Sequence, residues 1–215
     1  MPSPEPLPVF HSPESWIVSL CLGQRQQQSA LTVLRKQTVT QSTKRLNYYD
    51  CLELRRYEAR TPYDVLIEDV RTVCKPLHKP SLVIDITAVR MTIATLFRCA
   101  KLTARLVPVQ LASGELTPME DGSWAVPKLD LVSLMGVLTG SRRLDGKKPL
   151  LAISADLPLL GELTQELKGF TAKVVVGVGG EGEVWRASAG EDIVLAVALG
   201  CLAGERLAVR FSVGC

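Results

Sequence analysis

The distribution of apolar and polar residues divides the chain into short elements typical of an α/β domain. Three strand-like runs come first, and the polar breaks between them have turn-like composition, so they predict an antiparallel meander over residues 16–22, 30–40 and 45–56. Beyond residue 60, helical spacing alternates with short β-branched runs. This order predicts a mixed β-sheet, a three-strand meander plus parallel strands, flanked by helices.

The same criteria assign the rest of the chain. Helical spacing predicts helices over 62–74, 89–101, 129–138, 157–170 and 193–203. Further strands are expected over 81–86, 104–110, 150–154 and 207–213, with a hairpin over 173–178 and 183–187. Residues 113–127 are predicted to be rich in loops. Residues 1–14 are rich in proline and predict a flexible arm, which leaves one domain over 15–215.

Bulk composition excludes several classes of protein. The chain has 215 residues, 47% of them hydrophobic and 22% charged, which is typical of a globular domain with a substantial core. Six cysteines without a CxxC pair argue against a zinc site and a disulfide framework, and favour the cytoplasm. No apolar run is long enough for a membrane span. The net charge of +3 is too small to indicate nucleic acid by itself.

Acidic residues stand at two element ends where chemistry could occur. Asp85 closes the apolar run LVID, and Glu191 and Asp192 open the last apolar helix. From spacing alone, Asp85 is an ordinary strand-end acid that caps the following helix. Glu191 and Asp192 are acids favoured by the helix dipole in a first turn. The local pattern therefore does not require a metal site.

Several segments, kept in order over about residues 15–204, together resemble one family. They resemble the ribonuclease H-like C-terminal nuclease domain of phage terminase large subunits, the DNA-packaging proteins, and its stand-alone bacterial relatives. The segments that carry the resemblance are SLCLGQRQQQSALTVL (19–34), TPYDVLIEDV (61–70), LVIDITAVR (82–90), VPVQLASGE (107–115), VPKLDLVSLMGVL (126–138), LLGELTQELKGF (159–170) and VWRASAGEDIVLAVALG (184–200). No GxxxxGK[ST] phosphate loop, the mark of an ATPase motor, is present in this chain.

The resemblance implies a site built from three carboxylates that hold one or two divalent metals for phosphodiester cleavage. It places Asp85 as the middle acid and Asp192, assisted by Glu191, as the last. The implied cofactor is Mg²⁺ or Mn²⁺, which prefer oxygen ligands. The implied partner is DNA.

The first acid of the family falls on Cys21, a soft ligand poorly suited to Mg²⁺ and best read as a small core hydrophobe. Other departures lie close by: Gln27 stands where a second Asp is common, Ala88 and Arg90 replace two glycines, and Ala189-Gly190-Glu191 replaces a His-Asp step. These changes predict a weakened or inactive nuclease that acts as a binding module for nucleic acid or protein.

Two alternatives stay open. The chain is an active divalent-metal-dependent endonuclease, with Asp85 and Asp192 as ligands, or it is a structural interaction protein with no role in nucleic-acid binding. Oligomeric state is not predicted. Four basic pairs are candidate contacts for a phosphate backbone: Lys44-Arg45, Arg55-Arg56, Arg142-Arg143 and Lys147-Lys148.

Overall fold

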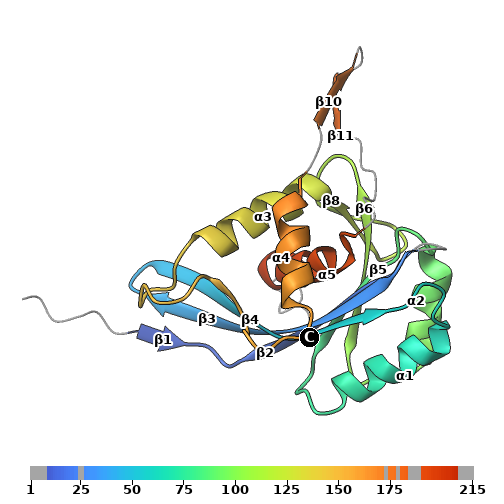
Figure 1. The fold of residues 1–215 in the computed structure, drawn as a ribbon, viewed down its shortest axis with the longest axis horizontal. Coiled ribbons are helices and arrows are strands. Elements are labelled where there is room, and N and C mark those ends of the chain that lie inside the picture. The colour runs from blue at the N-terminus through green and yellow to red at the C-terminus, as the bar shows by residue number, and fades with distance from the viewer. Residues whose placement is uncertain (1–8, 24–26, 172–173, 178–179, 184–189, 208–215) are drawn as a thin grey trace, which may run out of the picture.

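The computed structural model describes residues 9–23, 27–171, 174–177, 180–183 and 190–207, with the backbone alone for Arg90 and for 174–183. These residues form a nine-stranded sheet in the order β7-β8-β6-β5-β2-β3-β4-β9, with β1 added beside β3 (Figure 1). The strands are β1 (Val9–His11), β2 (Ser15–Cys21), β3 (Ser29–Gln41), β4 (Lys44–Tyr57), β5 (Ser81–Asp85), β6 (Arg105–Ala112), β7 (Thr117–Pro118), β8 (Trp124–Pro127) and β9 (Leu151–Ile153).

Strands β2, β3 and β4 form the antiparallel meander that the sequence predicts. Most of their apolar residues are buried, on both faces, as expected of a sheet covered by helices on both sides. A bulge between Val33 and Leu34 shifts the register of β3 against β4. Such a bulge increases the local twist of the long pair.

Parallel pairing extends the sheet on both sides of the meander. Strand β5 runs parallel to β2 and β6, β8 runs parallel to β6, and β9 runs parallel to β4. Helix α1 (Tyr63–Cys74) connects β4 to β5, and α2 (Arg90–Cys99) connects β5 to β6. Parallel strands require such crossover connections, which place helices over the sheet. The predicted mixed sheet flanked by helices is therefore confirmed.

Each face of the sheet carries its own hydrophobic cluster. Helices α1 and α2 cover one face, and α3 (Lys128–Gly140), α4 (Leu160–Gly169) and α5 (Asp192–Leu202) cover the other (Figure 1). Every residue of α5 from Ile193 to Leu202 is buried, and a π-helical turn, Ala203–Leu207, follows it. Because α5 packs directly on β2 and β3, its first residue has a fixed position relative to the ends of those strands.

Three features differ from the sequence prediction. Residues 9–11 of the predicted flexible arm form β1, because they can extend the open edge of β3, and Ser12 continues the contact through Thr38. The predicted loop 113–127 contains β7 and β8. The hairpin pairs β10 (Val174–Gly177) with β11 (Gly180–Glu183), so its second strand begins earlier than the predicted residue 183. The predicted strand 207–213 falls almost entirely outside the described residues.

The helices of the described residues are too short or too polar for a membrane span. None of them combines the length and the apolar character needed to cross a bilayer.

Candidate functional site at the ends of β2, β5 and α5

The candidate site lies where two neighbouring parallel strands end together. Cys21 is the last residue of β2 and Asp85 is the last residue of β5, and the register of the two strands places them opposite each other. Both are buried, and the Cys21 thiol donates a hydrogen bond to Asp85 Oδ2 across 3.7 Å. The cysteine at the position implied for the first acid thus touches the predicted middle acid directly.

Asp85 forms a tight turn with the residues that follow it. Its Oδ1 accepts hydrogen bonds from the backbone N–H of Thr87, at 2.9 Å, and from the Thr87 hydroxyl. That hydroxyl in turn accepts a bond of 2.7 Å from the backbone N–H of Leu111 on β6. The carboxylate therefore holds a strand-end turn, and α2 begins five residues later without a side-chain cap, so the helix-capping reading of Asp85 is wrong.

Burial controls the protonation of this pair. Burial raises the pKa of the Cys21 thiol well above its ordinary value, and the charges of Asp85 and Asp192 raise it further. Burial also raises the pKa of Asp85, against the lowering effect of its bonds with Thr87 and Cys21. Because both carboxylates act on one thiol, Cys21 keeps its proton at neutral pH and is a hydrogen-bond donor here.

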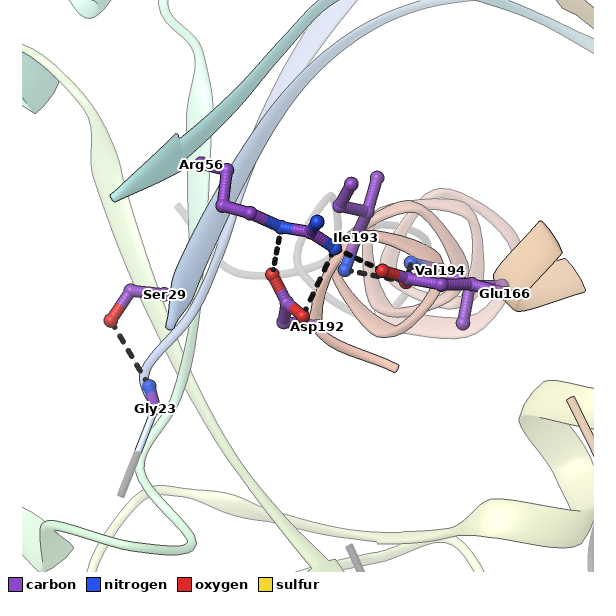
Figure 2. Close-up of polar contacts among 7 residues, drawn as sticks. All are labelled: Gly23, Ser29, Arg56, Glu166, Asp192, Ile193 and Val194. Atoms are coloured by element: carbon purple, nitrogen blue, oxygen red, sulfur yellow. Dashed lines mark hydrogen bonds and ion pairs between the residues drawn. The ribbon is translucent and has the colours of Figure 1, made fainter. Parts of the chain in front are cut away.

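Asp192 lies in the same region but is engaged by an arginine (Figure 2). Arg56, near the end of β4, donates to Asp192 through Nε at 2.8 Å and through Nη2 at 3.2 Å. The same Nη2 bonds to Glu166 on α4. The side chains of Arg56, Asp192 and Glu166 are 20%, 12% and 7% exposed, so the guanidinium is shielded from water between two carboxylates. Planar arginine suits this two-sided contact.

Glu166 also caps the helix that presents Asp192. Its Oε2 accepts hydrogen bonds of 2.9 Å from the backbone N–H groups of Ile193 and Val194, as Figure 2 shows. These groups would otherwise lack partners in the first turn of α5. Burial raises the pKa of Glu166, and the bonds with Val194 and Ile193 and the charge of Arg56 act against that rise. Glu166 therefore fixes the start of α5 and one side of Arg56 at the same time.

Glu191, the third predicted site acid, contacts a different element. Its Oε2 lies 2.7 Å from Nζ of Lys128, the first residue of α3, and both side chains are buried. Lys128 also lies over the Phe170 ring, 5.3 Å from its centroid. Among the described residues, no hydrogen bond or ion pair joins Glu191 to Cys21, Asp85 or Asp192. The structure thus joins Cys21 to Asp85, pairs Asp192 with Arg56 and turns Glu191 towards α3.

The other departures noted in the sequence are only partly described. Ala88 lies in the turn between β5 and α2, whereas the side chain of Arg90 and the whole of Ala189 lie outside the described residues. Across the described part of the chain, no three or more His, Cys, Asp or Glu side chains form a group that could hold a metal ion.

Sequence reasoning missed Glu166 and the internal roles of Arg56 and Lys128. Arg55 and Arg56 were expected as phosphate contacts, but Arg55 bonds to Glu53 and Asp69, and Arg56 bonds inside the site. The available sequence signal for Glu166 is its spacing, three residues after Leu163 on the side of α4 that is buried.

The fold is that of large terminase nuclease domains, a ribonuclease H-like nuclease fold. The chain is similar to the large terminase nuclease of thermophilic phage G20c with bound cobalt, with a TM-score of 0.52, 16% identity, and coverage of 87% of this chain and 80% of that one. It is similar to the nuclease domain of the large terminase subunit of bacterial virus Sf6, with a TM-score of 0.50, 7% identity and 86% of each chain covered. A mutant of the Sf6 domain, crystallised with manganese and beta-thujaplicinol, gives a TM-score of 0.51 at 7% identity, again over 86% of each chain.

Sequence comparisons add no further assignment. No protein-family model matches the chain, and no curated protein sequence matches it. The resemblance read from the ordered sequence segments is therefore confirmed as a likeness of fold.

Proposed function

We propose that this chain is a terminase-nuclease-like protein with a degenerate metal site. In this proposal its cleavage activity is weakened or lost, and it acts by binding nucleic acid or protein. The observation that carries the proposal is the two-bond contact from Arg56 to Asp192, at 2.8 and 3.2 Å, because it occupies both oxygens of an implied metal ligand.

The residues present do not suit a hard divalent cation. The protonated thiol of Cys21 offers neither the charge nor the oxygen that Mg²⁺ or Mn²⁺ prefers. Asp192 is already neutralised by Arg56, and Glu191 by Lys128. A metal bound at Asp192 would have to displace a shielded guanidinium that also bonds to Glu166. Such a displacement would leave buried charges unpaired, which is strongly unfavourable.

An active endonuclease is the second candidate. It is favoured by the buried contact of Asp85 with Cys21, a thiol whose pKa the burial, Asp85 and Asp192 all raise. Mg²⁺ or Mn²⁺ bound there would supply Lewis-acid activation of water. In that case Arg56 would have to leave Asp192, and Asp85→Ala would abolish cleavage.

Metal binding separates these two functions. Manganese binding is measured by electron paramagnetic resonance on the purified protein, on Cys21→Asp, and on Cys21→Asp combined with Arg56→Gln. The proposal expects no specific binding by the wild type and binding in the double variant, which restores an acid and frees Asp192. Specific binding by the wild type that Asp85→Ala removes would contradict it. Failure of the double variant to bind would mean that the site has diverged beyond these two positions.

A further inference from the structure

One end of the molecule carries a concentration of positive charge that the candidate site does not use. The loop 141–149, which follows α3, packs against β4 beside the β3–β4 hairpin, at the end of the molecule opposite α1 and α2 (Figure 1). We name the exposed cations of this loop and of the hairpin the basic surface: Lys44, Arg45, Arg142, Lys147 and Lys148.

The loop is fixed rather than loosely attached. Arg143 donates to the backbone carbonyl of Tyr49 at 3.0 Å and to Asp50 at 2.5 Å, and its guanidinium lies 5.0 Å from the Tyr48 ring centroid. The backbone N–H of Leu144 donates to the Tyr48 hydroxyl at 2.9 Å. A bond of 2.8 Å from the N–H of Arg143 to the carbonyl of Lys148 closes the loop. The loop cations therefore keep a constant position relative to β4.

Two arginines of this region are already paired, whereas the basic surface is not. Arg143 and Arg35 share Asp50, and Arg35 also reaches Glu14 at 3.4 Å. Within the described part of the chain, no salt bridge engages any of the five basic-surface cations. This separates them from Arg55 and Arg56, which are both bound internally.

The local charge exceeds that of the whole protein. The five cations of the basic surface are accompanied by one exposed acid of the loop, Asp145, which gives a local net charge of +4 against +3 for the entire chain. Lys44 stands four residues before Tyr48 on β4, about 13 Å along a strand. That span exceeds the Debye length at physiological salt, about 8 Å, so the hairpin cations and the loop cations attract separate phosphates of one extended polyanion.

A pocket opens beside the basic surface. Its volume is about 450 Å³, and its lining combines Lys148 and the ion-paired Arg35 and Asp50 with apolar residues that include Leu52, Pro149 and Ile153. An apolar wall beside Lys148 suits a nucleotide, whose base can lie on the wall while its phosphate meets this exposed cation. A flat lipid headgroup layer would not enter such a pocket.

We propose that the basic surface binds nucleic acid through its phosphate backbone, away from the candidate site of Cys21, Asp85 and Asp192. This inference rests on the proposed function, whose partner it names. Each cation that neutralises a phosphate releases counterions, so the affinity must fall steeply with salt.

The test uses two triple variants of equal net charge. Arg142→Glu, Lys147→Glu and Lys148→Glu reverse the basic surface, and Lys75→Glu, Lys79→Glu and Arg98→Glu reverse three exposed cations around α1 and α2. Fluorescence anisotropy follows the binding of a labelled 30-nucleotide single strand and of a 30-base-pair duplex between 50 and 200 mM salt. Thermal unfolding confirms that both variants fold.

The inference predicts salt-dependent binding by the wild type, at least about tenfold weaker in the basic-surface variant, with a log–log salt slope reduced by about 2. The control variant should stay within about threefold of the wild type. Three results would each overturn the inference. They are an equal loss of DNA affinity in both variants, no binding of either DNA form by the wild type, and binding only to vesicles of anionic lipid. These outcomes are distinct from the manganese measurement, which tests the proposed function without DNA.

Discussion

Arg56 on β4 and Asp192 at the start of α5 are joined by two hydrogen bonds, of 2.8 and 3.2 Å, although 136 residues separate them in sequence. The bonds place a permanent positive charge at Asp192, the carboxylate that the sequence resemblance implies as a metal ligand. Glu166 completes the arrangement, because it binds Arg56 with one oxygen and the first turn of α5 with the other. The arrangement of Asp192, Glu166 and the start of α5 therefore depends on the side chain of Arg56.

Replacement of Arg56 should strongly destabilise the protein. Arg56→Ala leaves Asp192 and Glu166 shielded from water without a cation, and the loss of one partner of a buried pair costs about 3 kcal/mol. Chemical denaturation measures the free energy of unfolding. Arg71→Ala is the control, because the exposed Arg71–Glu68 pair should contribute less than about 1 kcal/mol. Equal effects of the two substitutions would mean that Arg56 does not hold the site together.

The buried pair Lys128–Glu191 gives a second prediction. Lys128→Met should destabilise the protein by about 3 kcal/mol because it leaves the Glu191 carboxylate buried and unpaired. The double variant Lys128→Met/Glu191→Gln removes that charge and should recover most of the loss. Both values follow from denaturant unfolding curves. If the double variant were less stable than Lys128→Met, the unpaired charge of Glu191 would not be the main cause of the lost stability.

Much of the fold follows from local sequence. The meander, the helices and the strand that ends at Asp85 are predicted because apolar periodicity is strong there. Strand β1 is not predicted from the sequence, because prolines surround it and its extended conformation depends on pairing with β3. The partners of the acids escape for a similar reason, since Arg56 and Glu166 stand 110 residues apart and no local pattern couples them. Local sequence thus positions the acids, and only the tertiary structure identifies what neutralises them.

Stability should depend on pH through Asp50. Burial raises the pKa of the Asp50 carboxyl, but hydrogen bonds from Arg143 and Arg35 outweigh it and hold the pKa below the ordinary value. The contribution of Asp50 is therefore complete above the unfolded-state pKa of about 3.9, and is lost as the pH falls through the lower folded-state pKa. The difference in melting temperature between the wild type and Asp50→Asn should stay constant between about pH 7 and 5 and shrink below about pH 4. A difference that grows towards low pH would reverse the sign of this interaction.

The π-helical turn after α5 requires a glycine. A Cβ added at Gly204 would lie 2.5 Å from the Tyr49 hydroxyl oxygen and 3.0 Å from Ile17 Cδ1. Gly204→Ala should therefore cost about 1–3 kcal/mol, as overpacked core substitutions do. Gly136→Ala is the matched control, because Gly136 lies within α3 and has nothing within 4 Å of its Cβ position, so alanine should stabilise the helix by about 0.5–1 kcal/mol. Similar thermal stability of the two variants would refute the close contact at Gly204.

The central proposal is that the carboxylates of this site do not support metal-dependent cleavage. In this proposal Cys21 stands in place of the implied first acid, and Arg56 stands in place of a metal ion at Asp192. A plasmid nicking assay with Mg²⁺ and with Mn²⁺, run on the wild type beside Asp85→Ala, tests it most directly. The account predicts no divalent-dependent nicking by well-folded wild-type protein, and no difference from the variant. Nicking that requires the metal and disappears in Asp85→Ala would contradict the account and establish an active nuclease.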